Sequence, residues 1–219
     1  GKLKKINGLM SVGEAACVSV HGANRLGSNS LLDLVVFGKS AAKRCSNILN
    51  PNSKNKKILP SDYENIIKRF EKVKNSSGKY KISNLRLEMQ QIMQNYCPVY
   101  RSEKKMLEGI KKLQVLLKKF DEIKINDKSY VWNTEIIEAL ELENLLLQSI
   151  ASIESALNRK ESRGAHSRID FKKRNDKSWL KHTMVWMSTG KKPNIKYRSV
   201  NLKTNNKEIK TIEPKARVY

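Results

Sequence analysis

Four stretches in the middle of the chain repeat their apolar residues at the spacing of an amphipathic helix. They lie at residues 61–70, 83–96, 106–120 and 134–157. Ser61–Glu64 also has the pattern of a capping box directly after Pro60, which predicts the start of the first helix there. Because such stripes form cores more often than cofactor sites, the pattern predicts an antiparallel helical bundle.

The first 50 residues follow a different pattern, in which small residues and glycines precede an apolar run. Residues 10–16 predict a short buried strand and a turn, and a polar loop that contains glycine follows. Leu31–Gly38 then begins an apolar helix that should continue to about Leu49. Ser30 is the residue type that an N-cap requires, so we expect this helix to start there.

The chain becomes irregular from Ser162 onward, although alternation in Ile195–Val200 predicts short strands. This part is too weakly apolar to form a core of its own, so we expect an arm that wraps over the rest. The predicted fold class is α+β, mostly α. Its expected divisions are residues 1–50, a linker at 51–60, a helical domain at 61–160 and a C-terminal capping segment at 161–219.

The charge is strongly positive, with 44 Lys and Arg against 21 Asp and Glu among 219 residues, a net charge of +23. The excess is mostly Lys and is spread along the whole chain. No Arg-rich arm, aromatic platform or finger motif accompanies it, so we do not expect a nucleic-acid partner. A compositional bias toward Lys, Asn and Ile accounts for the charge better.

Several other functions are disfavoured by what the sequence lacks. No stretch of about 18 apolar residues predicts a membrane span, and no apolar signal core follows the basic start, so export is not expected. The first residue is not Met, which suggests a processed or truncated start. Cys17, Cys45 and Cys97 are odd in number and widely spaced, which argues against a disulfide framework and predicts no metal site.

The loop before the apolar helix holds the candidate chemistry. It does not have the phosphate-loop pattern, because no Lys follows its second glycine, and the chain has no G-x-G fingerprint. A buried Glu14 after a strand could hold ribose hydroxyls, and the helix start could attract an anion. Arg25 could clamp a carboxylate with two parallel N–H bonds, or it could be a structural residue that bonds loop carbonyls.

Residues 13–38, from Gly13-Glu14 through His21-Gly22-Ala23-Asn24-Arg25 to Phe37-Gly38, closely resemble the flavoprotein subunit of succinate dehydrogenase. Further segments match in the order of that family, over essentially the whole chain. These segments are Leu85–Gln90, Val131–Thr134, Glu138–Leu145, Arg159–His166, Lys181–Thr183 and Arg217–Tyr219. The match resembles mitochondrial or alphaproteobacterial members and covers about the last third of such a subunit.

The resemblance implies that residues 1–50 are the C-terminal part of an FAD-binding domain. Glu14 then corresponds to the family's flavin-binding Glu, and Arg25 to its dicarboxylate-binding Arg. Ser30 and Leu31 correspond to backbone contacts with the isoalloxazine ring. The family's flavin-linked His, its proton-transferring Arg and its dinucleotide fold lie upstream of the matched part, so no catalytic residue is assigned in this chain.

The implied activity is the oxidation of succinate to fumarate with FAD, in the tricarboxylic acid cycle and respiratory chain. The implied partners are the N-terminal part of the flavoprotein if the subunit is split, an iron–sulfur subunit, and indirectly membrane-anchor subunits and quinone. The implied location is peripheral, on the matrix side of the mitochondrial inner membrane or the cytoplasmic face of a bacterial one. We expect this chain by itself to be inactive.

Two alternatives remain open at this stage. One is a related flavoenzyme fragment, of the fumarate reductase or L-aspartate oxidase type. The other is a non-enzymatic basic helical protein, although the retained Glu14, Arg25 and Ser30 argue against it. Among the histidines, we expect His21 to orient the loop by a hydrogen bond, and His166 and His182 to bond backbone in the capping segment.

Overall fold

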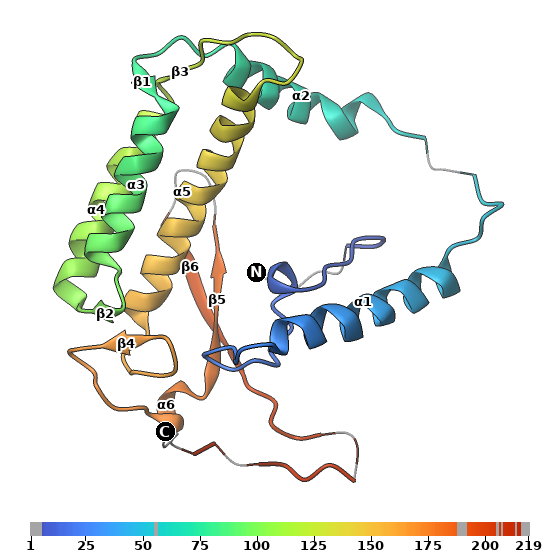
Figure 1. Ribbon diagram of the computed structural model, residues 1–219, viewed down its shortest axis with the longest axis vertical. Helices are drawn as coiled ribbons and strands as arrows, with labels where there is room; N and C mark the ends of the chain where they lie inside the picture. Colours follow the sequence, from blue (N-terminus) through green and yellow to red (C-terminus); the bar gives the residue numbers. More distant parts are fainter. Residues whose placement is uncertain are drawn as a thin grey trace.

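The chain is mostly helical with short strands in a computed structural model (Figure 1). The structure describes residues 6–54, 57–187, 192–204, 206, 208–212 and 214–215. The helices are α1 (Asn29–Ile48), α2 (Pro60–Lys74), α3 (Ile82–Tyr96), α4 (Glu103–Phe120), α5 (Thr134–Asn158) and α6 (Asp176–Trp179). The strands are β1 (Tyr80–Lys81), β2 (Tyr100–Arg101), β3 (Ile123–Lys124), β4 (Ser167–Arg168), β5 (Lys181–Trp186) and β6 (Asn194–Ser199).

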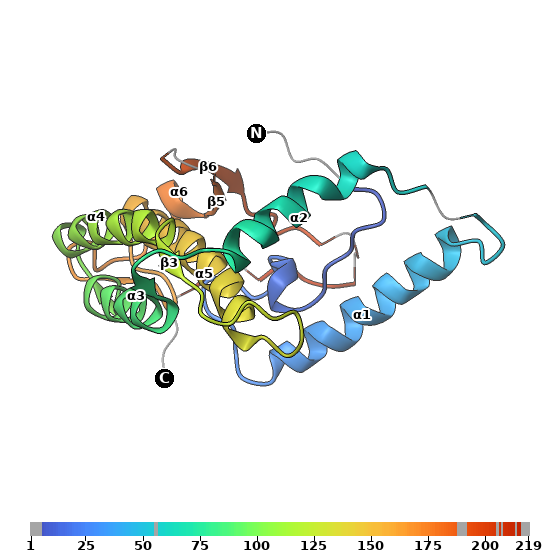
Figure 2. The same cartoon turned by 90° about the horizontal axis from the view of Figure 1, so that it is seen from above.

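Helices α3, α4 and α5 pack side by side and alternate in direction, as Figures 1 and 2 show. Their apolar stripes meet in one core of fully buried side chains, which include Met106, Leu113, Leu142 and Leu146. The helical stripes at 83–96, 106–120 and 134–157 therefore lie where the sequence predicts them. Asn133 caps α5, because its side chain accepts a hydrogen bond of 3.0 Å from the backbone N–H of Ile136.

Short parallel strand pairs hold the ends of this bundle. At one end β1 pairs with β3, and at the other β2 pairs with β4. The predicted alternation at Ile195–Val200 is confirmed as β6, which forms an antiparallel hairpin with β5 and has Tyr197 opposite Thr183. The hairpin contacts α5, so it covers one side of the helical core.

The segment after α5 is organised by ion pairs around the buried side chains of Arg168 and Glu161. Arg168 is fully buried; its guanidinium donates to the backbone oxygens of Ala156 and Leu157 and to both carboxylate oxygens of Asp170. The hydrogen bonds from Arg168 are the main reason why the pKa of Asp170 falls from 3.8 to about 2. A buried guanidinium needs partners of this kind, because unpaired charges in the interior are costly.

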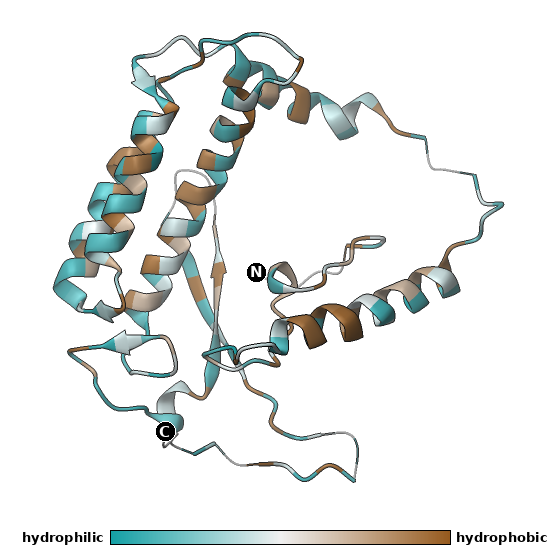
Figure 3. Cartoon of the chain, viewed as in Figure 1, coloured by the Kyte–Doolittle hydropathy of each residue, from teal (hydrophilic) through white to brown (hydrophobic). Residues whose placement is uncertain are grey.

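Helix α1 lies apart from the bundle, and its first turns are strongly apolar (Figures 1 and 3). Most of its apolar side chains are exposed, among them Leu31, Leu32 and Val35. Asp33 is the one residue of α1 that is buried. The apolar run of α1 was predicted correctly as a helix, but these side chains do not join the core.

Three local predictions are wrong. Residues 10–16 form no strand; Glu14–Ala16 is a 3-10 turn, and Met10 and Glu14 are exposed. Helix α1 begins at Asn29, so the N-cap position belongs to Ser28, which has a left-handed φ of 65°, and Ser30 lies inside the first turn.

The third correction concerns α2, which begins one residue before Ser61. Its N-cap position is Leu59, whose backbone N–H donates to Asp62 over 2.9 Å. Asp62, rather than the hydroxyl of Ser61, therefore satisfies a backbone group at this helix start, since the helix begins directly at Pro60.

Cys17, Cys45 and Cys97 are free thiols. Within the described residues, no helix is long and apolar enough to cross a membrane. The matched ending Arg217–Tyr219 lies outside the residues that the structure describes.

Candidate functional site

The loop between the 3-10 turn and α1 contains most of the unusual backbone of the described chain. Four non-glycine residues of the described chain have a positive φ, and three of them, Cys17, Ser19 and Ser28, lie in this loop. Gly13 and Gly22 in the same segment also have positive φ. Left-handed conformations of non-glycine residues are costly and concentrate at functional sites. The loop is therefore held in a specific shape that favours a binding role.

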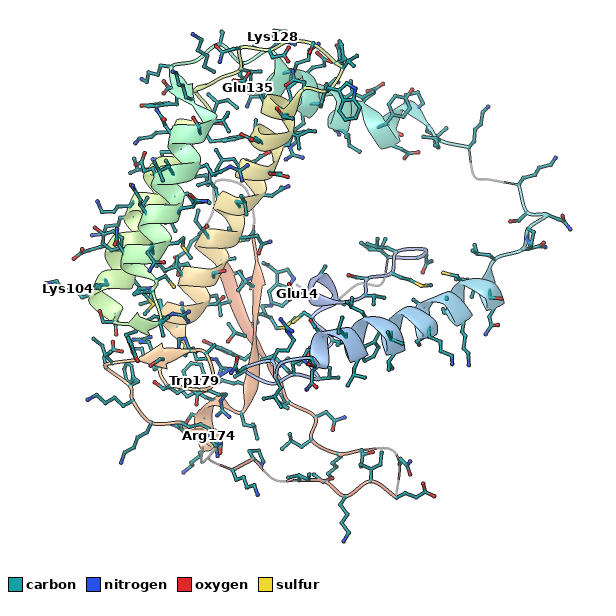
Figure 4. All side chains as sticks on the ribbon, viewed as in Figure 1. Glu14, Lys104, Lys128, Glu135, Arg174 and Trp179 are labelled. Atoms are coloured by element: carbon teal, nitrogen blue, oxygen red, sulfur yellow. The ribbon has the colours of Figure 1, made fainter. Side chains whose placement is uncertain are left out.

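The structure brings Glu14 and Arg25 together. The Nη2 of Arg25 donates to Oε1 of Glu14 over 3.3 Å, and both side chains are exposed. Figure 4 labels Glu14 on the 3-10 turn, close to the first turn of α1. An exposed ion pair of this kind contributes little to stability. Both groups therefore remain accessible to ligands that offer better partners.

The first turn of α1 is the third component of the site. No side chain caps this helix, although the backbone N–H of Leu31 donates to the Ser28 oxygen over 3.1 Å. The N-terminal end of a helix carries partial positive charge. Ser30 and Leu31 thus lie where that charge and the exposed apolar side chains of Leu31 and Leu32 meet.

His21 orients the loop, as predicted, and its partner is Asp33. The His21 Nε2 lies 2.8 Å from Oδ2 of Asp33, whose side chain is 6% exposed. The other carboxylate oxygen, Oδ1, is buried and has no hydrogen-bond partner among the described residues. Asp33 could not be predicted as this partner from the sequence, because one acidic residue in an apolar helix has no pattern that indicates a partner.

The C-terminal segment contacts the loop at two points. The backbone N–H of Ala165 donates to the oxygen of Ala23 over 3.3 Å, and Arg198 on β6 donates to Oγ of Ser19, also over 3.3 Å. The arm predicted from the sequence therefore reaches the candidate site.

His166 lies in the same segment and bonds the backbone oxygen of Arg159 through Nε2, as predicted. Its Nδ1 also accepts a hydrogen bond from Arg101, which the sequence did not predict. Burial, helped by the charges of Arg101, Arg168 and Arg159, lowers the pKa of His166 below its usual value.

His182 lies on β5, and among the described residues its ring forms no hydrogen bond of the kind that was predicted. Its pKa is also lowered, first by burial and then by the charges of Arg198 and Arg159. Neither His166 nor His182 is one of the residues of the loop.

These residues fit an FAD molecule by the chemistry of their groups. Glu14 presents an exposed carboxylate that can accept hydrogen bonds from ribose hydroxyls, and the α1 end, without a side-chain cap, can face the electron-rich side of a flavin ring. Leu31 and Leu32 offer apolar surface beside that helix end. A carboxylate, a helix terminus and an apolar surface together suit a nucleotide with a large planar ring.

Two families match the chain. The family described as "Fumarate reductase flavoprotein C-term" matches residues 86–219, and the one described as "FAD binding domain" matches residues 2–31. The second match ends at Leu31 and so includes Glu14, Arg25 and Ser30.

Curated proteins and solved structures agree with these matches. The succinate dehydrogenase flavoprotein subunit of Rickettsia bellii is 49% identical over 98% of this chain, and the mitochondrial one of Oryza sativa is 44% identical over 98%. A structure of E. coli quinol fumarate reductase superposes with a TM-score of 0.81 at 35% identity, over 95% of this chain and 35% of that one.

The chain spans only about a third of the length of these relatives, 36% of the Rickettsia bellii protein and 34% of the Oryza sativa protein. The agreement nevertheless covers both the helical core and the loop. The chain belongs to the family of fumarate reductase and succinate dehydrogenase flavoproteins, and it matches the C-terminal part of its members.

Proposed function

We propose that this chain forms the C-terminal part of a succinate dehydrogenase flavoprotein and supplies part of its flavin and dicarboxylate site. The observation that carries the proposal is the arrangement of Glu14, Arg25 and the start of α1 around one loop. The relatives in which the matching segments occur are named as succinate dehydrogenase flavoprotein subunits.

Glu14, Ser30 and Leu31 are the residues that would hold FAD. The carboxylate of Glu14 would accept hydrogen bonds from the ribose hydroxyls, and such charge-assisted bonds are stronger than neutral ones. The backbone at Ser30 and Leu31 would face the isoalloxazine ring, where the dipole of α1 favours negative charge. When bound, FAD supplies the acceptor for the hydride that leaves succinate.

Arg25 would bind one carboxylate of the dicarboxylate substrate. Its guanidinium lies half-exposed on the loop and makes one bond with Glu14, which leaves further N–H donors for a ligand. A carboxylate that accepts two parallel N–H bonds is fixed in angle as well as position. Arg25 would thereby hold the reacting carbons in place. Positioning of this kind can supply a large part of the reduction in the activation free energy.

The remaining assignments follow from the same proposal. Residues 1–50 would complete an FAD-binding domain, 51–60 would link it to the helical domain at 61–160, and 161–219 would cap the site. Electrons would pass through an iron–sulfur subunit to quinone held by membrane-anchor subunits. The complex would be peripheral to a mitochondrial or bacterial inner membrane.

Fumarate reductase is the second candidate function. The fumarate reductase flavoprotein subunit of Haemophilus influenzae is 36% identical over 98% of this chain, which is lower than the identity to the dehydrogenases. Because oxidation and reduction use the same site, the same roles for Glu14 and Arg25 apply in both directions.

Purification of the native complex through a tag on this chain tests the proposal. We expect a yellow complex with flavin absorbance that reduces an electron-accepting dye when succinate is added, and that malonate inhibits. A colourless complex, or a flavin complex that reduces no dye with succinate, would contradict the proposal. Faster oxidation of a reduced dye by fumarate would favour the second candidate.

A further inference from the structure

The turn Arg163–His166 touches the loop of Arg25 at its backbone. Gly164 has a φ of +57°, and a Cβ added there would lie 2.7 Å from both the carbonyl carbon and the oxygen of Ala23. The adjacent Ala165 donates its N–H to that same oxygen over 3.3 Å. Contacts this close between two backbones are possible only with glycine.

The turn itself is held firmly. The backbone N–H of Arg163 donates to the oxygen of His166 over 2.8 Å, and the reverse bond measures 3.0 Å. The side chain of Arg163 also forms bonds of 2.8 and 3.0 Å with the fully buried Glu161.

Glu161 accepts further hydrogen bonds, from Arg159 over 2.6 Å and from the Asn175 N–H over 2.9 Å. Burial by itself would raise the pKa of Glu161, but the hydrogen bonds from Arg163, Asn175 and Arg159 outweigh it and lower the pKa. Glu161 thus remains ionised and keeps the base of the turn in one arrangement.

The loop, by contrast, has few attachments between its ends. His21 is fixed by Asp33 at one end, and α1 begins at Asn29 at the other. Arg25 is exposed between them, two residues beyond Ala23. The contact at Ala23 is therefore the attachment nearest to the guanidinium that would bind the substrate, apart from the exposed pair with Glu14.

We propose that the turn Arg163–His166 is a positioning element of the dicarboxylate site: Gly164 and Ala165 hold the backbone of Ala23 and so set the place of Arg25. The proposal rests on the role proposed above for Arg25. It assigns to the C-terminal segment a function in substrate binding as well as in covering the core. Gly164 and Ala165 are positioning residues, since neither would touch the substrate.

The test compares Gly164→Ala with Gly8→Ala in the assembled enzyme. Both glycines have a positive φ, but a Cβ at Gly8 meets nothing within 4 Å. Both variants thus carry backbone strain, and only the first displaces Ala23. Gly164→Asn is the second variant, because Asn adopts positive φ more readily than Ala and still carries the Cβ.

We expect the dissociation constant for malonate to rise about tenfold or more in both Gly164 variants, and kcat/KM for succinate to fall by about ten- to a hundredfold. Hydrogen–deuterium exchange in residues 21–28 should become faster at the same time. Gly8→Ala should match the wild type in all three measurements. The melting temperatures of the Gly164 variants and Gly8→Ala should be similar, whereas their dissociation constants for malonate should differ clearly.

Two results would overturn the inference. If Gly164→Ala and Gly164→Asn keep wild-type malonate affinity and wild-type exchange in the loop, the turn does not position Arg25. If loop exchange and affinity change only in proportion to a lowered melting temperature, the turn is structural. A wild-type enzyme that does not bind malonate would instead refute the proposed function, and the positioning role with it.

Discussion

The helical core and the candidate site differ in what holds them together. In α3, α4 and α5, apolar side chains such as Leu113 and Leu146 are completely buried. From Gly13 to the end of α1, the buried residues are Gly13 and Asp33, while Leu31 and Leu32 are exposed. Stability therefore resides mainly in the core, and the groups proposed to bind ligands lie on a part of the chain that contributes little to it.

This difference separates two kinds of substitution. Changes in the core should act on folding, because a buried side chain contributes to the free energy of folding through its transfer from water and its packing. Changes in the loop should act on ligand binding, because its polar groups make exposed contacts of small energetic value within the chain.

The largest effect on stability is expected for Leu113→Ala. This substitution should lower the free energy of unfolding by about 2–5 kcal/mol, because it leaves a cavity among fully buried neighbours. The matched change Leu32→Ala, on the exposed side of α1, should stay within about 0.5 kcal/mol. Urea unfolding of the purified chain measures both, and equal losses would show that α1 belongs to the same cooperative core.

The largest effect on activity is expected for Arg25→Lys in the assembled enzyme. The charge remains but the planar fork is lost, so succinate turnover should fall by a hundred- to a thousandfold, about 3–4 kcal/mol of transition-state stabilisation. Flavin content should stay near that of the wild type. Steady-state dye reduction measures the turnover. Activity within a fewfold of wild type would contradict the proposal that Arg25 binds a substrate carboxylate through two parallel N–H bonds.

A smaller effect is expected for Glu14→Gln. The amide accepts hydrogen bonds from ribose hydroxyls more weakly than the carboxylate does, so FAD binding should weaken by about 1.5–3 kcal/mol. Flavin content after extended dialysis measures this loss. Substrate affinity in the fraction that retains flavin should change less. A variant with full flavin content but weaker malonate binding would contradict this role, since Glu14 would then serve the substrate and not the flavin.

The smallest effect concerns pH and the ion pair between the buried Arg168 and the exposed Asp170. Because bonds from Arg168 lower the pKa of Asp170 to about 2, the ionised carboxylate stabilises the fold above pH 3.8, and this stabilisation is lost as the pH falls through about 2. Asp170→Asn should therefore lower the melting temperature at pH 6 more than at pH 2. Equal differences at both pH values would show that the pair does not stabilise the fold.

Helices α3, α4 and α5 could be predicted because their apolar residues repeat with the helical period, which places one face of each helix in the core. The stripe at 61–70 has the same period and forms α2, but its side chains Tyr63, Ile66 and Ile67 stay exposed, so the prediction that it joins the bundle core is wrong. The pairs around Glu161 and Arg168 could not, because they join polar residues across a loop without any periodicity. Their only sequence signal is a cluster of charges, which is typical of exposed surface as well.

The candidate site shows the same limit. Small and apolar residues at 10–16 suggested a strand, yet Gly13 and Cys17 adopt positive φ and end the segment as a 3-10 turn. The proximity of Glu14 and Arg25 follows from that turn, so spacing in the sequence could not predict it. The resemblance to a known family identified both residues, but not their contact with each other or the support from Ala165.

The malonate affinity of Arg25→Lys, measured by calorimetry beside its thermal unfolding, tests the separation of stability and binding most directly. We expect the dissociation constant of Arg25→Lys to rise by about a hundredfold or more, with a melting temperature within about 2 °C of the wild type. Wild-type malonate affinity together with a clearly lowered melting temperature would contradict this expectation, since Arg25 would then serve the structure of the loop and not its ligand.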